Sequence, residues 1–172
     1  MLMVGLFFSA PSSAQSILLL DIEAVITNAA AYTSMIAQVE AERQIQQAFF
    51  GQAEEELREE SQRLVDQREE ISAQEFEVYR QSFDEKVRNL QERARDIQAT
   101  IRDAQAQALA QIRADALMIA QRIGEARGAQ VILEQNTTLV IIDQAADITA
   151  DVAAQLDDVR PEVKLTFDGA SE

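Results

Sequence analysis

The chain has 172 residues, a length that suits one domain. It contains no cysteine and no histidine, so disulfides, thiol catalysis and the commonest transition-metal ligands are excluded. Thirty acidic against fifteen basic side chains give a net charge of −15, which repels nucleic acid and disfavours anionic membrane surfaces. Because no paired nucleophile and base and no glycine-rich phosphate loop are present, we predict no enzyme activity, catalytic residue, cofactor, metal site or small-molecule substrate.

Residues 1–14 read MLMVGLFFSAPSSA, a short apolar run followed by Pro11 and small residues. Ser12 and Ala14 suit the −3 and −1 positions of a signal-peptidase site, so we predict a signal peptide and export of the chain. The run is too short to cross a bilayer. A secretory signal normally opens with lysine or arginine, and this one does not; either the true start lies upstream or the export inference is weaker.

Residues 17–20 form a short apolar run, closed by Asp21, that looks like a buried strand, although periodicity alone does not separate it from the start of a helix. Residues 22–31 are rich in alanine and predict a short helix. Ser34 then suits the N-cap of a longer helix.

Residues 34–127 are the stretch around which the chain is organised. They contain no proline, their only glycines are Gly51 and Gly124, and strong helix formers dominate. Apolar residues alternate four and three positions apart in the second half, which predicts a coiled-coil seam. This seam consists of Phe83, Val87, Leu90, Ala94, Ile97, Ile101, Ala104 and Ala108, and after a stutter it resumes at Ile112, Ala116, Ile119 and Ile123. A stutter unwinds a supercoil locally, so we expect different packing beyond it.

The first half of this stretch predicts an outgoing helix with a narrower apolar stripe. Near the base the stripe consists of Ile36, Val39, Ile45, Phe49 and Ala53, and beyond Gly51 it thins to Leu57, Leu64 and Ile71. We therefore expect the distal part to bend and splay more than the base. Acids gather between Glu54 and Glu77, spread around the helix, which favours a solvated surface over a metal site. They could pair weakly with basic side chains of the second half: Arg80, Arg88, Arg93, Arg95 and Arg102.

A turn separates the two halves of this stretch near residues 71–76. Ser72 and Glu75 have the spacing of a capping box, and Ile71 and Phe76 have that of a hydrophobic staple. We predict an outgoing helix to about Glu70 and a returning helix from residue 73, together a long antiparallel hairpin. One continuous helix with a harmless internal serine is the alternative.

Gly128 is placed to end the returning helix. Residues 131–133 and 139–142 are rich in β-branched side chains and predict two strands joined by a polar turn. A last helix is predicted from residues 147–149 to Pro161. Its inner face would carry Val152, Ala153 and Leu156, and residues 161–172 would form a loose tail.

The predicted fold class is α+β and predominantly α, with a long helical hairpin (residues 34–127) as an arm on a small β body (residues 15–33 and 128–160). So few strands and short helices form a poor core by themselves. We therefore expect the body to be completed by other copies of the chain, and a homotrimer is the predicted assembly.

The chain resembles the OmpH/Skp family of periplasmic chaperones. The resemblance rests on the apolar first strand (residues 17–20) behind a signal peptide, the charged hairpin, the two later strands and, most specifically, the segment DITADV at residues 147–152. It implies a periplasmic homotrimer with a central β-barrel body, whose three helical arms enclose unfolded outer-membrane β-barrel proteins and prevent their aggregation without ATP.

Candidate client-binding residues near the tip are Phe76, Tyr79 and Phe83, although Phe83 also lies on the seam. The best-known family members are basic and this chain is acidic, which argues against contact with lipopolysaccharide and against binding by positively charged arms. Two alternatives stay open: a structural coiled-coil spacer such as the stalk of a rotary ATPase, and a cytosolic prefoldin-like holdase.

Overall fold

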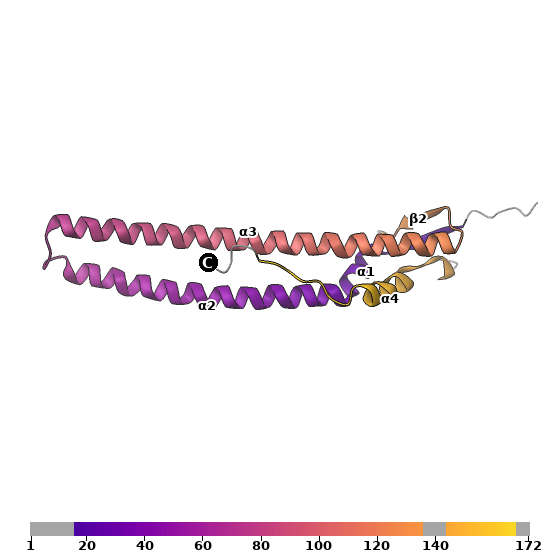
Figure 1. The fold of residues 1–172 in the computed structure, drawn as a ribbon, viewed down its shortest axis with the longest axis horizontal. Helices are drawn as coiled ribbons and strands as arrows, with labels where there is room; N and C mark the ends of the chain where they lie inside the picture. The colour runs from indigo at the N-terminus through magenta and orange to yellow at the C-terminus, as the bar shows by residue number, and fades with distance from the viewer. Residues whose placement is uncertain (1–15, 136–143, 168–172) are drawn as a thin grey trace, which may run out of the picture.

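The computed structural model describes residues 16–135 and 144–167 (Figure 1). The predicted signal peptide and the predicted strand at residues 139–142 lie outside these ranges. The elements follow in the order β1 (Ile17–Leu20), α1 (Ile22–Asn28), α2 (Ala30–Gln67), α3 (Ala73–Ala126), β2 (Val131–Glu134), the 3-10 helix η1 (Gln144–Ala146) and α4 (Thr149–Val159). The α+β, predominantly helical fold class is thereby confirmed.

The two long helices form the predicted antiparallel hairpin. α2 has 38 residues and α3 has 54, and the chain reverses between Gln67 and Ala73. The capping box is present: the Glu75 N–H donates to Ser72 Oγ at 3.2 Å, and the Ser72 N–H donates to Glu75 Oε2 at 3.1 Å. These two bonds satisfy backbone donors that the start of α3 would otherwise leave open. The alternative of one continuous helix is wrong, and α2 ends somewhat earlier than the expected Glu70.

The start of α2 differs from the prediction. Ser34 is not its N-cap, because α2 already begins at Ala30, directly after an extended Ala29. The Ala30 N–H donates to Asp157 Oδ1 of α4 at 2.8 Å. A residue distant in sequence therefore satisfies a free N–H at the start of α2, which local sequence does not reveal.

Strands β1 and β2 pair in parallel, with Ile17 opposite Val131 and Leu20 opposite Glu134. Parallel neighbours need a crossover connection, and here the whole hairpin lies between them. A single bridge from Leu19 to Asp147 adds the segment before α4 to the same sheet, and the Ile148 N–H donates to the Leu19 carbonyl at 2.9 Å. The sheet thus joins β1, β2 and the segment before α4 at the root of the hairpin.

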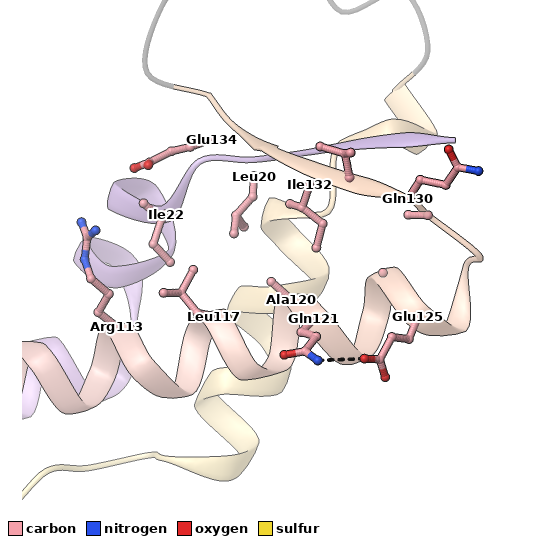
Figure 2. A pocket seen from close by; sticks show the side chains of 13 residues that line it. Leu20, Ile22, Arg113, Leu117, Ala120, Gln121, Glu125, Gln130, Ile132 and Glu134 are labelled. Carbon is pink, nitrogen blue, oxygen red and sulfur yellow. Dashed lines mark hydrogen bonds between the residues drawn. The ribbon is translucent and has the colours of Figure 1, made fainter. Parts of the chain in front are cut away.

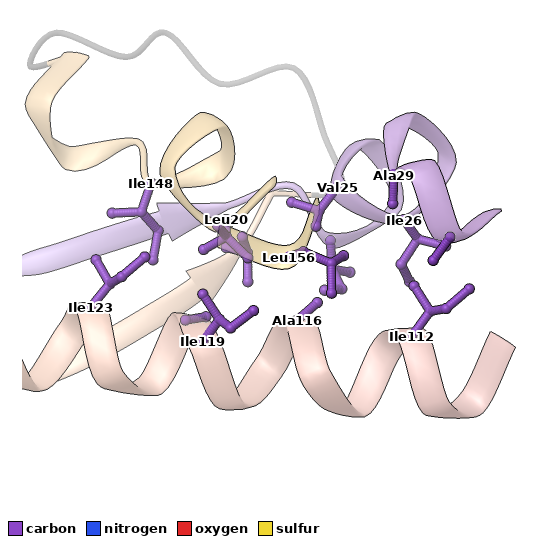
Figure 3. Close-up of a cluster of buried hydrophobic side chains, with 14 of the residues drawn as sticks. Leu20, Val25, Ile26, Ala29, Ile112, Ala116, Ile119, Ile123, Ile148 and Leu156 are labelled. Atoms are coloured by element: carbon purple, nitrogen blue, oxygen red, sulfur yellow. The ribbon is translucent and has the colours of Figure 1, made fainter. Parts of the chain in front are cut away.

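Gly128 ends α3 as predicted, with a φ of +66° that a glycine adopts without strain. The main core fills the space between α3, α1, α4, the start of α2 and the sheet (Figure 3). The seam positions after the stutter all point into this core: Ile112, Ala116, Ile119 and Ile123. On α4, Val152 and Leu156 are fully buried, as their predicted place on its inner face requires.

The apolar stripe of α2 is partly wrong. Val39 is buried, but Ile36, Ile45 and Phe49 are 40%, 61% and 41% exposed. The buried positions are Ala31, Met35, Val39 and Gln46. Along most of its length α2 packs against few elements other than α3. The side of α2 on which α3 lies therefore decides which of its apolar positions are covered.

The segment after α4 also corrects the prediction of a loose tail from residue 161. Val163 is 3% exposed and belongs to the main core, and Leu165 and Phe167 pack against the long helices. The prediction failed because a short run of alternating apolar residues does not show, from sequence alone, what it packs against. The surface that covers it exists only once the hairpin has formed.

Candidate functional site

The hairpin projects from the body as a long, thin arm (Figure 1). A second apolar cluster of Val39, Ile97 and Ile101 lies where the arm leaves the body. Among the described residues of α2 and α3 beyond this cluster, no hydrophobic side chain is fully buried. The seam positions Phe83 and Leu90 are only half-buried there. Two helices without a third layer leave much apolar surface in contact with water.

The three predicted tip residues lie on α3 but differ in accessibility. Tyr79 is 52% exposed and borders a shallow hollow of about 280 Å³, which it shares with Val78 and two polar neighbours. Phe76 is half-buried, with the Arg68 guanidinium 5.6 Å from its ring centre. Phe83 is half-buried on the seam. Of the three, Tyr79 is the most accessible to a partner.

Charges at the tip are paired mainly within α3. Arg80 donates to Glu77 and to Asp84, at 2.7 Å and 2.8 Å for the closest atoms. The Arg80 hydrogen bonds lower the pKa of Glu77 to about 2, and Glu77 raises the pKa of Arg80. The hydrogen bonds from Ser72 likewise lower the pKa of Glu75. The tip is therefore ionised and strongly hydrated at neutral pH.

Among the described residues, one ion pair joins the two helices of the arm: Lys86 of α3 and Glu60 of α2, with Nζ 2.7 Å from Oε1. The predicted pairing by arginines of the return helix is not seen: Arg80 pairs within its own helix, and Arg93 stacks on an aromatic ring. The Arg93 guanidinium lies 4.5 Å from the ring centre of Phe49. Such stacking is an attractive cation–π contact.

Two exposed residues in the middle of the arm escaped the sequence prediction. Ile45 and Phe49 were expected inside the hairpin, yet Ile45 is mostly exposed and Phe49 is 41% exposed. Phe49 also meets Phe50 edge to face, with ring centres 5.3 Å apart. The six-residue step from Val39 to Ile45 breaks the alternation of three and four residues, and it is the signal in the sequence that could have identified Ile45.

The body also exposes apolar side chains. Its exposed apolar side chains are Ile17, Val131 and Leu133 on the sheet and Leu117 and Met118 on α3. A hollow of about 510 Å³ lies between α3 and the sheet, and Leu20, Leu117 and Ile132 are among the residues that line it (Figure 2). Gly124 lies beneath the sheet, where an added Cβ would be 3.0 Å from the Ile132 side chain. The hollow is mostly apolar, with Arg113 and Glu134 at its rim.

Within residues 16–135 and 144–167, acidic side chains form no cluster of three or more that could hold a metal ion. None of the described helices has the length and apolar character needed to cross a bilayer.

Comparison with known proteins agrees with this architecture. Among solved structures, the chain is similar to a protein from Caulobacter crescentus CB15 that is proposed to be an outer membrane chaperone (OmpH-like). The two share 17% sequence identity and a TM-score of 0.79, over 93% of this chain and 95% of the other, which shows a common fold. No curated protein matches the chain in sequence. Residues 16–156 match the family model for outer membrane protein (OmpH-like). Because this match spans most of the sequence, the chain belongs to the OmpH-like family.

Proposed function

We propose that the chain is an ATP-independent holdase that binds unfolded outer-membrane β-barrel proteins in the periplasm and prevents their aggregation. Membership of the OmpH-like family supports a chaperone role and a periplasmic location. The observation that carries the proposal is the arm, a pair of helices whose distal apolar side chains have no core to enter.

The chemistry of the arm suits such clients. A strand of an unfolded membrane barrel alternates apolar and polar residues, so it needs a surface that offers weak apolar contacts among charges. The exposed apolar side chains of the arm are Ile36, Ile45, Phe49, Val65, Val78 and Tyr79. Phe76, Tyr79 and Phe83 remain the proposed contacts near the tip. Each contact is weak, and several arms acting together would supply the affinity.

We also propose that the working form is a homotrimer. The two paired strands form too small a sheet for a stable body, and Ile17, Val131 and Leu133 expose apolar area on it. Other copies would bury this area and join the arms around one client.

The first experiment measures mass and activity together on the chain from Gln15 onward. Size-exclusion chromatography with light scattering should give three times the protomer mass. Dilution of a urea-unfolded outer-membrane barrel into the protein, without ATP, should give less turbidity than dilution into buffer. A monomer that leaves aggregation unchanged contradicts the proposal, and an elongated oligomer that does the same favours the spacer alternative.

A matched pair of variants locates the binding surface. Val78 on the arm and Val159 on α4 are almost equally exposed, at 61% and 60%. Val78→Ser combined with Tyr79→Ser should weaken client affinity roughly threefold to tenfold, corresponding to about 1 kcal/mol of lost apolar contact. Val159→Ser should leave affinity unchanged. Equal effects at both positions would place the binding surface elsewhere.

A further inference from the structure

The segment that follows α4 runs extended between α2 and α3 toward the middle of the arm (Figure 1). From Glu162 to Phe167 its exposure alternates residue by residue. Val163 is buried and Leu165 and Phe167 are half-buried, whereas the residues between them are exposed. This alternation is that of a β-strand with one covered face.

The covered face lies against the second apolar cluster, Val39, Ile97 and Ile101, which we call the seam patch. Leu165 and Phe167 both pack against it. The seam patch combines side chains from both long helices, so the segment bridges the arm at its root.

Gln38, next to the seam patch on α2, holds the backbone of the segment. Its Nε2 donates to the Val163 carbonyl at 2.5 Å, and its Oε1 accepts from the Leu165 N–H at 3.0 Å. A residue on a neighbouring parallel strand bonds in the same way, to the carbonyl before and the N–H after the residue it faces. The same Nε2 also donates to Ser34 Oγ at 3.1 Å and to the Ser34 carbonyl at 3.3 Å, one turn earlier on α2. Toward the segment, this side-chain amide bonds as a strand residue would and contacts only backbone, which every extended peptide offers.

These contacts define a ligand class: extended peptide with apolar side chains at every second position and any residue between them. The same description fits a strand of an unfolded membrane barrel. We propose that the seam patch and Gln38 form a binding site for such client segments, and that residues 161–167 occupy this site in the absence of client. This inference rests on the proposed holdase function and specifies the client feature that is recognised.

The segment is held in a way that permits exchange. It is anchored at its start, where Arg160 pairs with Asp115 of α3, and Val163 adds to the main core. Beyond Val163 the segment is held by the Gln38 amide and by the half-buried Leu165 and Phe167, of which Leu165 also touches the main core. Being part of the same chain, the segment acts at an effective concentration in the millimolar range. A single free peptide would compete poorly, whereas a client held by several arms would displace it.

The first test compares the chain with a version that ends at Arg160, using fluorescein-labelled peptide PEVKLTF and fluorescence anisotropy. The shortened chain should bind this peptide at least tenfold more tightly than the full chain does. The peptide PEVLKTF, with equal composition but broken alternation, should bind at least tenfold more weakly. A peptide with the same alternation but different apolar residues, PEIKVTY, should bind about as well as the first. Absence of binding, equal binding of PEVLKTF, or binding of PEVKLTF alone would overturn the proposal.

The second test keeps the whole chain, so that folding of the shortened version does not decide the outcome. The natural sequence has no cysteine, so Thr166→Cys places a single nitroxide label on the segment. Addition of an unfolded outer-membrane barrel should sharpen the electron paramagnetic resonance lines of this label. A label at Ala154→Cys on α4 should not change. A Thr166 label that stays immobile while client is bound overturns the inference but leaves the holdase function standing. A chain that binds no client fails as a holdase, and the peptide test alone then judges the seam patch.

Discussion

In the body, α3 packs against α1, α4 and the sheet, and its Ile112 and Ile119 are at most 1% exposed. Toward the tip the same helix meets only α2, and Phe83 and Leu90 stay half-buried. The apolar spacing is similar in both regions, so the difference is the number of layers around the helix. A seam excludes water fully only where a third element covers its flanks. Stability is therefore concentrated in the body, and accessible apolar surface in the arm.

The largest expected effect compares two leucines. Leu156→Ala in the body core should lower the free energy of unfolding by about 2–5 kcal/mol, because the site is fully enclosed. Leu90→Ala on the arm should cost about 1 kcal/mol, because water already reaches the site. Urea unfolding followed by circular dichroism, at one fixed protomer concentration, measures both. Equal losses would show that the arm has a core of its own.

Removal of the capping box tests whether the tip of the arm unfolds independently of the body. Ser72→Ala should destabilise the first turn of α3 by about 1 kcal/mol, since the Glu75 N–H loses its acceptor. Hydrogen exchange should accelerate at the tip and remain unchanged at body amides. Ser82→Ala, an exposed serine inside the same helix, is the control and should not accelerate exchange. Faster exchange in the body would mean that the two regions unfold as one.

A smaller effect is expected from the ion pair across the hairpin. A double-mutant cycle of Lys86→Ala and Glu60→Ala should give a coupling energy of about 0.2–1 kcal/mol, because water reaches both groups. The coupling should fall further in 1 M salt, where the screening length is about 3 Å. Coupling well above this range would indicate that the arm is held together by charge.

The smallest effect concerns pH at the tip. The pKa of Glu77 is lowered from 4.5 to about 2 by the hydrogen bonds from Arg80. Because the folded pKa lies below the unfolded one, the stabilisation is present above pH 4.5 and is lost as the pH falls toward 2. Carbon NMR of the Glu77 carboxyl should titrate near pH 2, and exchange at the start of α3 should accelerate over the same interval. Glu77→Gln should reduce the acceleration and leave the part that Glu75 contributes, whereas a titration near 4.5 would show that the pair is not formed.

Sequence patterns predicted those parts of the fold that depend on neighbours along the chain. The Ser72–Glu75 box marked the reversal, and Gly128 marked the end of α3. Patterns failed where a residue distant in sequence decides the outcome. Asp157 of α4 contacts the start of α2 in place of the expected cap Ser34. Of the candidate site, residue types at the tip were predictable, but the exposure of Ile45 and Phe49 was not.

The sequence alone therefore determined the helical hairpin and its reversal point, because capping, turn chemistry and heptad spacing act over a few residues. Tertiary structure alone decided which apolar positions are covered, since that depends on where a second and third layer lie. It left Ile45 exposed, paired β1 with β2 although the whole arm separates them in sequence, and placed residues 161–167 on the seam patch.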